Sequence, residues 1–224
     1  DLWVSDHDRR GDSLEVYQRH LPDVCRTYGF HYLDTEPIVL DDADLAVVGS
    51  VNWYDYSWSL DRMKQEVPDW EWRLEHKAFS RGRHNDRRFV RWALDDVRFT
   101  AQVVDTMKRH LAAALARVQH ALVVTHHPAF HGITFPRPGP AQGLDELLWE
   151  ALSGNRDLEE ALLECAGRIP LILSGHTHRS TQARLGPALG INIGGDYHFK
   201  RLVVFDWPSQ AVEHLTFGDP VRRR

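Results

Sequence analysis

Two apolar runs of this chain each end abruptly in histidines, and this pattern constrains the fold more than any other feature. Ala121 to Thr125 leads directly into His126-His127-Pro128, and Pro170 to Leu173 leads into Ser174-Gly175-His176-Thr177-His178-Arg179. Short apolar runs bounded by turn-forming residues are typical of buried strands. Imidazole nitrogen is the commonest side-chain metal ligand and is largely neutral near pH 7. The two junctions therefore predict a metal site on loops at the ends of two strands.

The pattern has a simpler alternative. A single histidine after a strand is more often a hydrogen-bonded loop residue, and a chain with 14 histidines forms chance pairs more readily than most. Gly175, however, frees the backbone to aim the two rings that follow it. Taken on their own, His126, His176 and His178 predict a three-histidine zinc site with one open position for water.

Composition excludes several classes of protein. With 224 residues, of which 42% are hydrophobic, the chain can bury one substantial core, so residues 1–224 are interpreted as a single domain. The net charge of -5 argues against a general nucleic-acid or membrane-surface binder, and nucleic acid is expected only as a substrate. No stretch approaches the ~18 apolar residues of a membrane span. Without a visible signal peptide, we expect a cytoplasmic protein.

The expected elements alternate between helices and strands. Helices are predicted from Leu14 to Tyr28, closed by Gly29, and from Asp95-Asp96 onward. Further helices are expected at 144–153 and 157–166, and strands at 30–33, 37–40, 45–49, 201–206 and 211–217. This order predicts an α/β fold with mixed sheets, helices outside them, and the site on loops at strand ends.

Residues 51–91 form an irregular aromatic and basic segment, interpreted as a substrate rim or cap insertion. Trp53 and Tyr54 are candidate substrate contacts, although core packing is an open alternative. Between Lys77 and Arg91 there are five arginines and one lysine against Asp86 alone. A solvated surface explains such a run, but forked guanidinium groups also suit an anionic, phosphorylated substrate.

The two histidine junctions carry a resemblance. His126-x-Pro128 and Gly175-His176-x-His178 resemble, in order and spacing, the last two motifs of the calcineurin-like metallophosphoesterase family. Asp1-Leu2-Trp3 is similar to the residues at the end of that family's Gly-Asn-His-Asp motif. The resemblance implies part of a metallophosphoesterase β-sandwich with flanking helices. It further implies that this chain is the C-terminal portion, without the N-terminal βαβ part and its metal-binding carboxylates.

The resemblance also implies a reaction and a set of residues. His126 and His176 would hold one divalent cation and His178 a second, the ions being Mn, Fe or Zn. A metal-bound hydroxide would then hydrolyse a phosphomonoester or phosphodiester substrate. Asp1 would serve catalysis by orienting a histidine that assists the leaving group. We expect His127 and Arg179, together with Trp53 and Tyr54, to bind substrate.

Two other functions remain open from the sequence. One is a self-sufficient zinc hydrolase that uses His126, His176 and His178. The other is a metallophosphoesterase-like module that has lost catalysis and binds a partner through its aromatic and basic surface. Because three neutral histidines without carboxylates leave two metal charges uncompensated, we expect little phosphatase activity from residues 1–224 alone. The sequence predicts no oligomeric state.

Overall fold

A six-stranded mixed sheet forms the centre of the protein. The computed structural model describes residues 2–4, 11–134 and 143–218. Within them the strands lie in the order β1-β2-β3-β4-β6-β5. Their bounds are β1 (Ile38–Leu40), β2 (Leu45–Ser50), β3 (His120–Thr125), β4 (Leu171–Ser174), β5 (Thr181–Leu185) and β6 (Ala188–Asn192). Strands β2, β3, β4 and β6 are parallel, and the edge strands β1 and β5 are antiparallel to their neighbours. The predicted α/β fold with a mixed sheet is confirmed.

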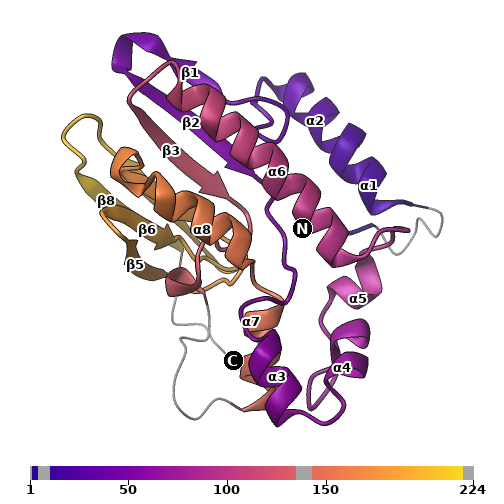
Figure 1. Ribbon diagram of the computed structural model, residues 1–224. Helices are drawn as coiled ribbons and strands as arrows, with labels where there is room; N and C mark the ends of the chain where they lie inside the picture. The colour runs from indigo at the N-terminus through magenta and orange to yellow at the C-terminus, as the bar shows by residue number, and fades with distance from the viewer. Residues whose placement is uncertain (1, 5–10, 135–142, 219–224) are drawn as a thin grey trace.

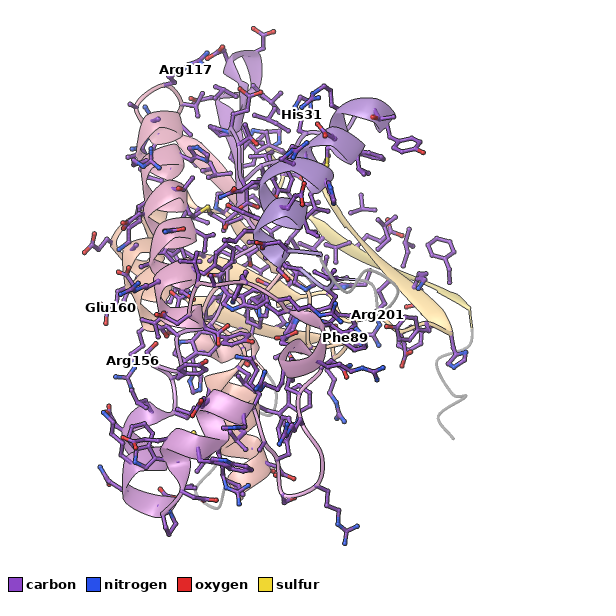
Figure 2. All side chains as sticks on the ribbon, turned by 90° about the vertical axis from the view of Figure 1, so that its right-hand side faces the viewer. His31, Phe89, Arg117, Arg156, Glu160 and Arg201 are labelled. Carbon is purple, nitrogen blue, oxygen red and sulfur yellow. The ribbon has the colours of Figure 1, made fainter. Side chains whose placement is uncertain are left out.

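Helices cover the sheet, and a separate hairpin lies beside it. Helices α6 (Asp96–Leu115) and α8 (Arg156–Glu164) lie side by side in front of the strands in Figure 1. In Figure 2, α6 and the helical segment α1 (Ser13–Glu15), η1 (Val16–His20) and α2 (Leu21–Tyr28) lie on opposite sides of the sheet. Strands β7 (Phe199–Phe205) and β8 (Val212–Gly218) pair only with each other in the described structure. None of the helices described has the length and apolarity needed to cross a bilayer.

The core explains why these segments fold as they do. Asp95 caps α6 by accepting a hydrogen bond from the backbone N–H of Arg98 at 2.7 Å. Val104, Met107 and Leu111 recur at helical spacing along α6 and are buried against the sheet. In β3, Ala121, Val123 and Thr125 alternate with more exposed residues, so this strand turns one face towards α6. Burial of these two faces holds β3, and with it the histidines that follow it, against α6.

Residues 51–91 fold as short helices on top of α7 (Leu144–Ala151). The helices are α3 (Leu60–Glu66), α4 (Trp70–His76) and α5 (Asp86–Phe89). A second apolar cluster joins α3 and α4 to α7, and its buried members are Met63, Val67, Leu74, Leu147, Leu148 and Ala151. Figure 1 shows α3, α4 and α7 together below the carboxyl ends of the central strands. The function of this segment as a cap stays a prediction.

Two local predictions fail for identifiable reasons. Residues 30–33 form no strand. Gly29 ends α2 in a left-handed conformation, and the backbone N–H of Thr35 then closes a turn on the carbonyl of Tyr32 at 2.9 Å. The β5–β6 hairpin was not predicted, although Gly186, at φ +56°, begins the tight turn that joins its strands. Three short helices complete the described structure: η2 (Asp41–Ala43), η3 (His131–Ile133) and η4 (Ala166–Arg168).

Candidate metal centre

Three histidines meet at the carboxyl ends of β3 and β4. One potential ligand atom from each of His126, His127 and His176 lies within 4.8 Å of the others. Because β3 and β4 are parallel neighbours, the loops that leave them start at the same edge of the sheet. The backbone N–H of Gly175 donates to the carbonyl of His126 at 3.0 Å, which ties the two loops together. The predicted juxtaposition of the two histidine junctions is confirmed.

Hydrogen bonds beneath the cluster hold both loops in place. The hydroxyls of Thr125 and Ser174, the last residues of the two strands, lie 2.7 Å apart. Thr125 also donates to the carbonyl of His127 at 2.7 Å. The side-chain amide of Asn52, which is buried, donates to the carbonyl of Pro128 at 3.1 Å. These three hydrogen bonds therefore hold the backbone of the loops that carry the imidazoles.

His127 is the most unusual member of the cluster. Its side chain is 0% exposed, and neither ring nitrogen has a hydrogen-bond partner among the described residues. Its ring centroid lies 3.8 Å from that of His176 and 5.2 Å from that of His126. Buried polar atoms without partners destabilise a fold, so such a group calls for an explanation. A coordinated cation would supply a partner for one of the two nitrogens.

Burial keeps all three imidazoles in the form that binds metal. It lowers the pKa of His127 and of His176 well below the ordinary value, and lowers the pKa of His126 to about 3. Neutral imidazole is the coordinating form, and Zn²⁺, Fe²⁺ and Mn²⁺ all accept it. The donor set therefore fits one such cation. Among the described residues no carboxylate belongs to this cluster.

The histidines that gather are not the three that the sequence grouped. His178 lies outside the cluster, and its ring centroid is 6.0 Å from that of Tyr197. His176 and His178 both have left-handed backbones, at φ +66° and +56°, and the N–H of Thr177 turns back to the carbonyl of Gly175 at 2.8 Å. The tight loop directs the two rings differently. His127, adjacent to His126 in sequence, is in the cluster, and the proposed ligand role of His178 stays a prediction.

Trp53 and Tyr54 lie beneath the cluster rather than beside an open cavity. Both are 0% exposed, and their rings stack at 4.9 Å. Their centroids lie 4.7 Å and 5.6 Å from that of His127, so they form the apolar floor that removes His127 from water. Their role in this structure is packing, and contact with a substrate stays a prediction. Asp1, the predicted catalytic acid, lies outside the described residues.

A pocket of about 610 Å³ opens beside His176. Arg179, predicted to bind substrate, lines it together with Arg81 and Arg83. The remaining lining residues are Trp3, Phe79, His84, Asn85, Asp145, Trp149, Ser153, Thr177 and His178. This volume lies within the range of small-molecule sites. The arginines give the pocket an anion-attracting wall next to the candidate metal centre.

His84 and Asp86 form a pair that sequence reasoning missed. Asp86, 1% exposed, accepts hydrogen bonds from Trp3 Nε1 at 2.7 Å and from the Tyr54 hydroxyl at 2.8 Å. Its carboxylate also lies 3.1 Å from His84 Nδ1, and the His84 ring lies 6.2 Å from that of His176. Burial alone would raise the pKa of Asp86, but His84 and the two donors outweigh it and hold that pKa well below its usual range. The only sequence signal was the His84-Asn85-Asp86 spacing.

A second pocket, of about 410 Å³, reaches His126 from the other side. Asp34 lines it and accepts hydrogen bonds from the backbone N–H of Val51 at 2.7 Å, Ser50 Oγ at 2.9 Å and the Tyr17 hydroxyl at 3.0 Å. Burial raises the pKa of Asp34 to about 6, although these hydrogen bonds oppose the shift.

Comparison with known proteins gives a likeness in fold. No family model matches the chain, and no similar sequence is found among curated proteins. The structure resembles the crystal structure of phosphopantetheinyl hydrolase (PptH) from Mycobacterium tuberculosis, with a TM-score of 0.57 and 15% sequence identity. The match covers 88% of this chain and 66% of that chain. At this identity the likeness shows a shared fold.

Proposed function

We propose that this chain carries the metal centre of a metal-dependent phosphoesterase. The observation that carries the proposal is the cluster of His126, His127 and His176, in which His127 is fully buried and neither of its ring nitrogens has a described hydrogen-bond partner. His176 of the cluster also lines a pocket with three arginines in its wall. The likeness in fold to a phosphopantetheinyl hydrolase and the resemblance of the histidine motifs to metallophosphoesterases support the same reaction class.

Different residues of the chain would bind the cation, exclude water and bind the substrate in the proposed reaction. A bound cation acts as a Lewis acid on a phosphoryl oxygen and lowers the pKa of coordinated water. His126, His127 and His176 would hold that cation, and the floor of Trp53 and Tyr54 keeps water away from its buried side. Arg179, next to the metal-binding loop, would bind phosphoryl oxygens through its forked guanidinium.

We extend the proposal to a second divalent cation, with His178 as one of its ligands. His178 lies close enough to His126 for its charge to bear on the pKa of His126, and it lines the same pocket as His176. A second cation also needs carboxylate ligands, because several neutral imidazoles cannot balance two divalent charges. The ion would be Mn, Fe or Zn.

The test combines metal content with hydrolysis. Residues 1–224 are stripped with a chelator, reloaded with Mn²⁺ or Zn²⁺ and measured by elemental analysis. We expect one tightly bound cation per chain, lost in His127→Phe and in His176→Asn. Hydrolysis of p-nitrophenyl phosphate and its bis ester is measured with residues 1–224 and with the complete product of its gene.

The outcomes separate the candidate functions. Metal-dependent hydrolysis by the complete product, abolished by His176→Asn, supports the proposal. Efficient hydrolysis by residues 1–224 with a single zinc would replace it with the three-histidine zinc hydrolase. A protein that binds no cation in any form would refute both.

A further inference from the structure

We propose that Arg81 and Arg83 form a second anion-binding site at the mouth of the pocket. The site selects phosphate esters that carry another anionic group, such as a diphosphate, beside the phosphoryl group at the histidines. This inference rests on the proposed function for the reaction but on different residues for the binding. Arg81 and Arg83 are exposed, and among the described residues no carboxylate pairs with either of them.

The two arginines project from a rigid hairpin. Residues Ala78 and Arg83 form an antiparallel bridge, and the N–H of Phe79 donates to the carbonyl of Gly82 at 3.1 Å. Gly82 closes the turn at φ +81°, a conformation that glycine adopts without strain. Because the backbone of the turn is fixed, less conformational freedom is lost when the guanidinium groups bind a ligand.

The hairpin is also attached to the helices on both sides. Ser80 donates to the carboxylate of Asp145 through both its backbone N–H and its hydroxyl, each at 2.6 Å. Arg73 of α4 donates to the carbonyls of Ala78 and Phe79 at 3.2 Å and 3.3 Å. Asp145 is the one carboxylate among the described residues that line the pocket. Both of its carboxylate oxygens accept hydrogen bonds from Ser80. Asp145 therefore does not compete with an anionic ligand for Arg81 and Arg83.

The residue that follows the hairpin lies close to the candidate metal centre. His84 follows Arg83, and its ring lies 6.2 Å from that of His176. Because Arg81, Arg83 and His176 line the same pocket, a ligand that reaches both the histidines and the hairpin carries its two anionic groups within that pocket, as a diphosphate does. On the adjacent wall, the Trp149 ring is 38% exposed and lies 5.0 Å from that of Phe79. This exposed ring offers a planar surface for an aromatic or apolar part of the ligand.

Calorimetry with two matched ligands tests the inference. The probes are adenosine 5′-monophosphate and adenosine 5′-(α,β-methylene)diphosphate. The second carries one additional anionic group, joined through a P–CH₂–P link that phosphoesterases do not hydrolyse. Titrations use the 224-residue chain as isolated and again after dialysis against EDTA, so that a cation's contribution is separated from that of the arginines. We expect the diphosphate analogue to bind about tenfold more tightly than the monophosphate.

Variants assign the difference to the hairpin. Arg81→Ala and Arg83→Ala should each weaken binding of the diphosphate analogue roughly threefold, so that the two losses together remove the roughly tenfold preference and the double variant binds the two probes equally. Arg87→Ala is the matched control, since Arg87 is an exposed arginine that does not line the pocket. The preference should also shrink at high salt.

The two proposals fail in different ways. If the double variant keeps the full preference, or if wild type binds both probes equally, the second anion site is refuted while phosphoesterase activity is untouched. If the preference is present and depends on Arg81 and Arg83 but the metal-loaded complete gene product hydrolyses no phosphate ester, the anion site stands and the proposed function falls.

Discussion

Asp86 connects three parts of the chain, and removing its carboxylate should be among the most damaging single changes. The variant Asp86→Ala leaves Trp3 Nε1, the Tyr54 hydroxyl and His84 without the acceptor that each contacts within 3.1 Å. Hydrogen bonds to a charged group contribute about 1.5–3 kcal/mol each, while burial of the carboxylate offsets part of that gain. We expect a net loss of about 4 kcal/mol in the free energy of unfolding.

Urea denaturation followed by circular dichroism at pH 7.5 measures this loss. Asp86→Asn keeps one acceptor oxygen and should lose about half as much. Asp69→Ala removes an exposed carboxylate that pairs with Arg73 on α4, and its midpoint should stay close to that of wild type. An unchanged m-value shows that stability rather than the denatured state was altered.

The pH dependence gives a second check on the same carboxylate. The pKa of Asp86 is depressed in the folded protein, so its contribution is present above the unfolded pKa of about 3.9 and is lost as pH falls below it. The gap between wild type and Asp86→Ala should therefore narrow from pH 5 to pH 3. A gap under about 1 kcal/mol at pH 7.5, or one that is equally large in acid, would refute the reasoning.

Three further predictions concern the core, a titrating carboxyl group and the metal. Gly190→Ala places a Cβ 2.2 Å from Phe130 Cε1 and should lower the free energy of unfolding by about 1–3 kcal/mol in thermal unfolding. Adding Phe130→Leu should restore part of this loss. Unchanged stability in the single variant would show that the surrounding side chains rearrange without cost. The folded pKa of Asp34, about 6, exceeds its unfolded value, so wild-type stability should fall as pH rises from 4 to 6. This fall amounts to about 2 kcal/mol in the free energy of unfolding measured by urea denaturation, and Asp34→Asn should remove it. An unchanged fall in the variant would show that another group causes it. Zinc at about 100 times its Kd should stabilise the protein by about 2.7 kcal/mol, a rise of roughly 5–10 °C in Tm, and the rise should vanish in His127→Phe.

The sequence predicted those features that local signals encode. The apolar runs before His126 and His176 marked two strands whose parallel pairing brings their ends together, and Asp95 marked the start of α6. The choice between His127 and His178 depended on backbone dihedral angles in the loop of residues 175–180, which residue types alone do not determine. The direction in which each histidine ring points is set only when the loop folds.

Contacts between distant segments account for most of what sequence reasoning missed. The hydrogen bond from Trp3 to Asp86 spans 83 residues, and the one from Tyr54 to Asp86 spans 32. In the sequence, Asp86 was the one acidic residue in a basic run. Its role as a buried hydrogen-bond acceptor could be recognised only once these distant donors were placed beside it. Trp53 and Tyr54 were assigned to substrate because aromatic residues serve both cores and binding sites, and only burial separates the two uses.

The place where the described chain begins bears on how the protein is best produced. Leu2 lines the pocket that reaches His126, and Trp3 lines the pocket that reaches His176; Figure 1 shows this end of the chain inside the outline of the fold. The segment that contains Leu2 and Trp3 therefore contributes to both openings of the site region. A polyhistidine purification tag there would bring additional imidazoles to a cluster of imidazoles, and metal content measured on such a protein would count the tag's ions as its own. Removal of any such tag before the measurement avoids this error.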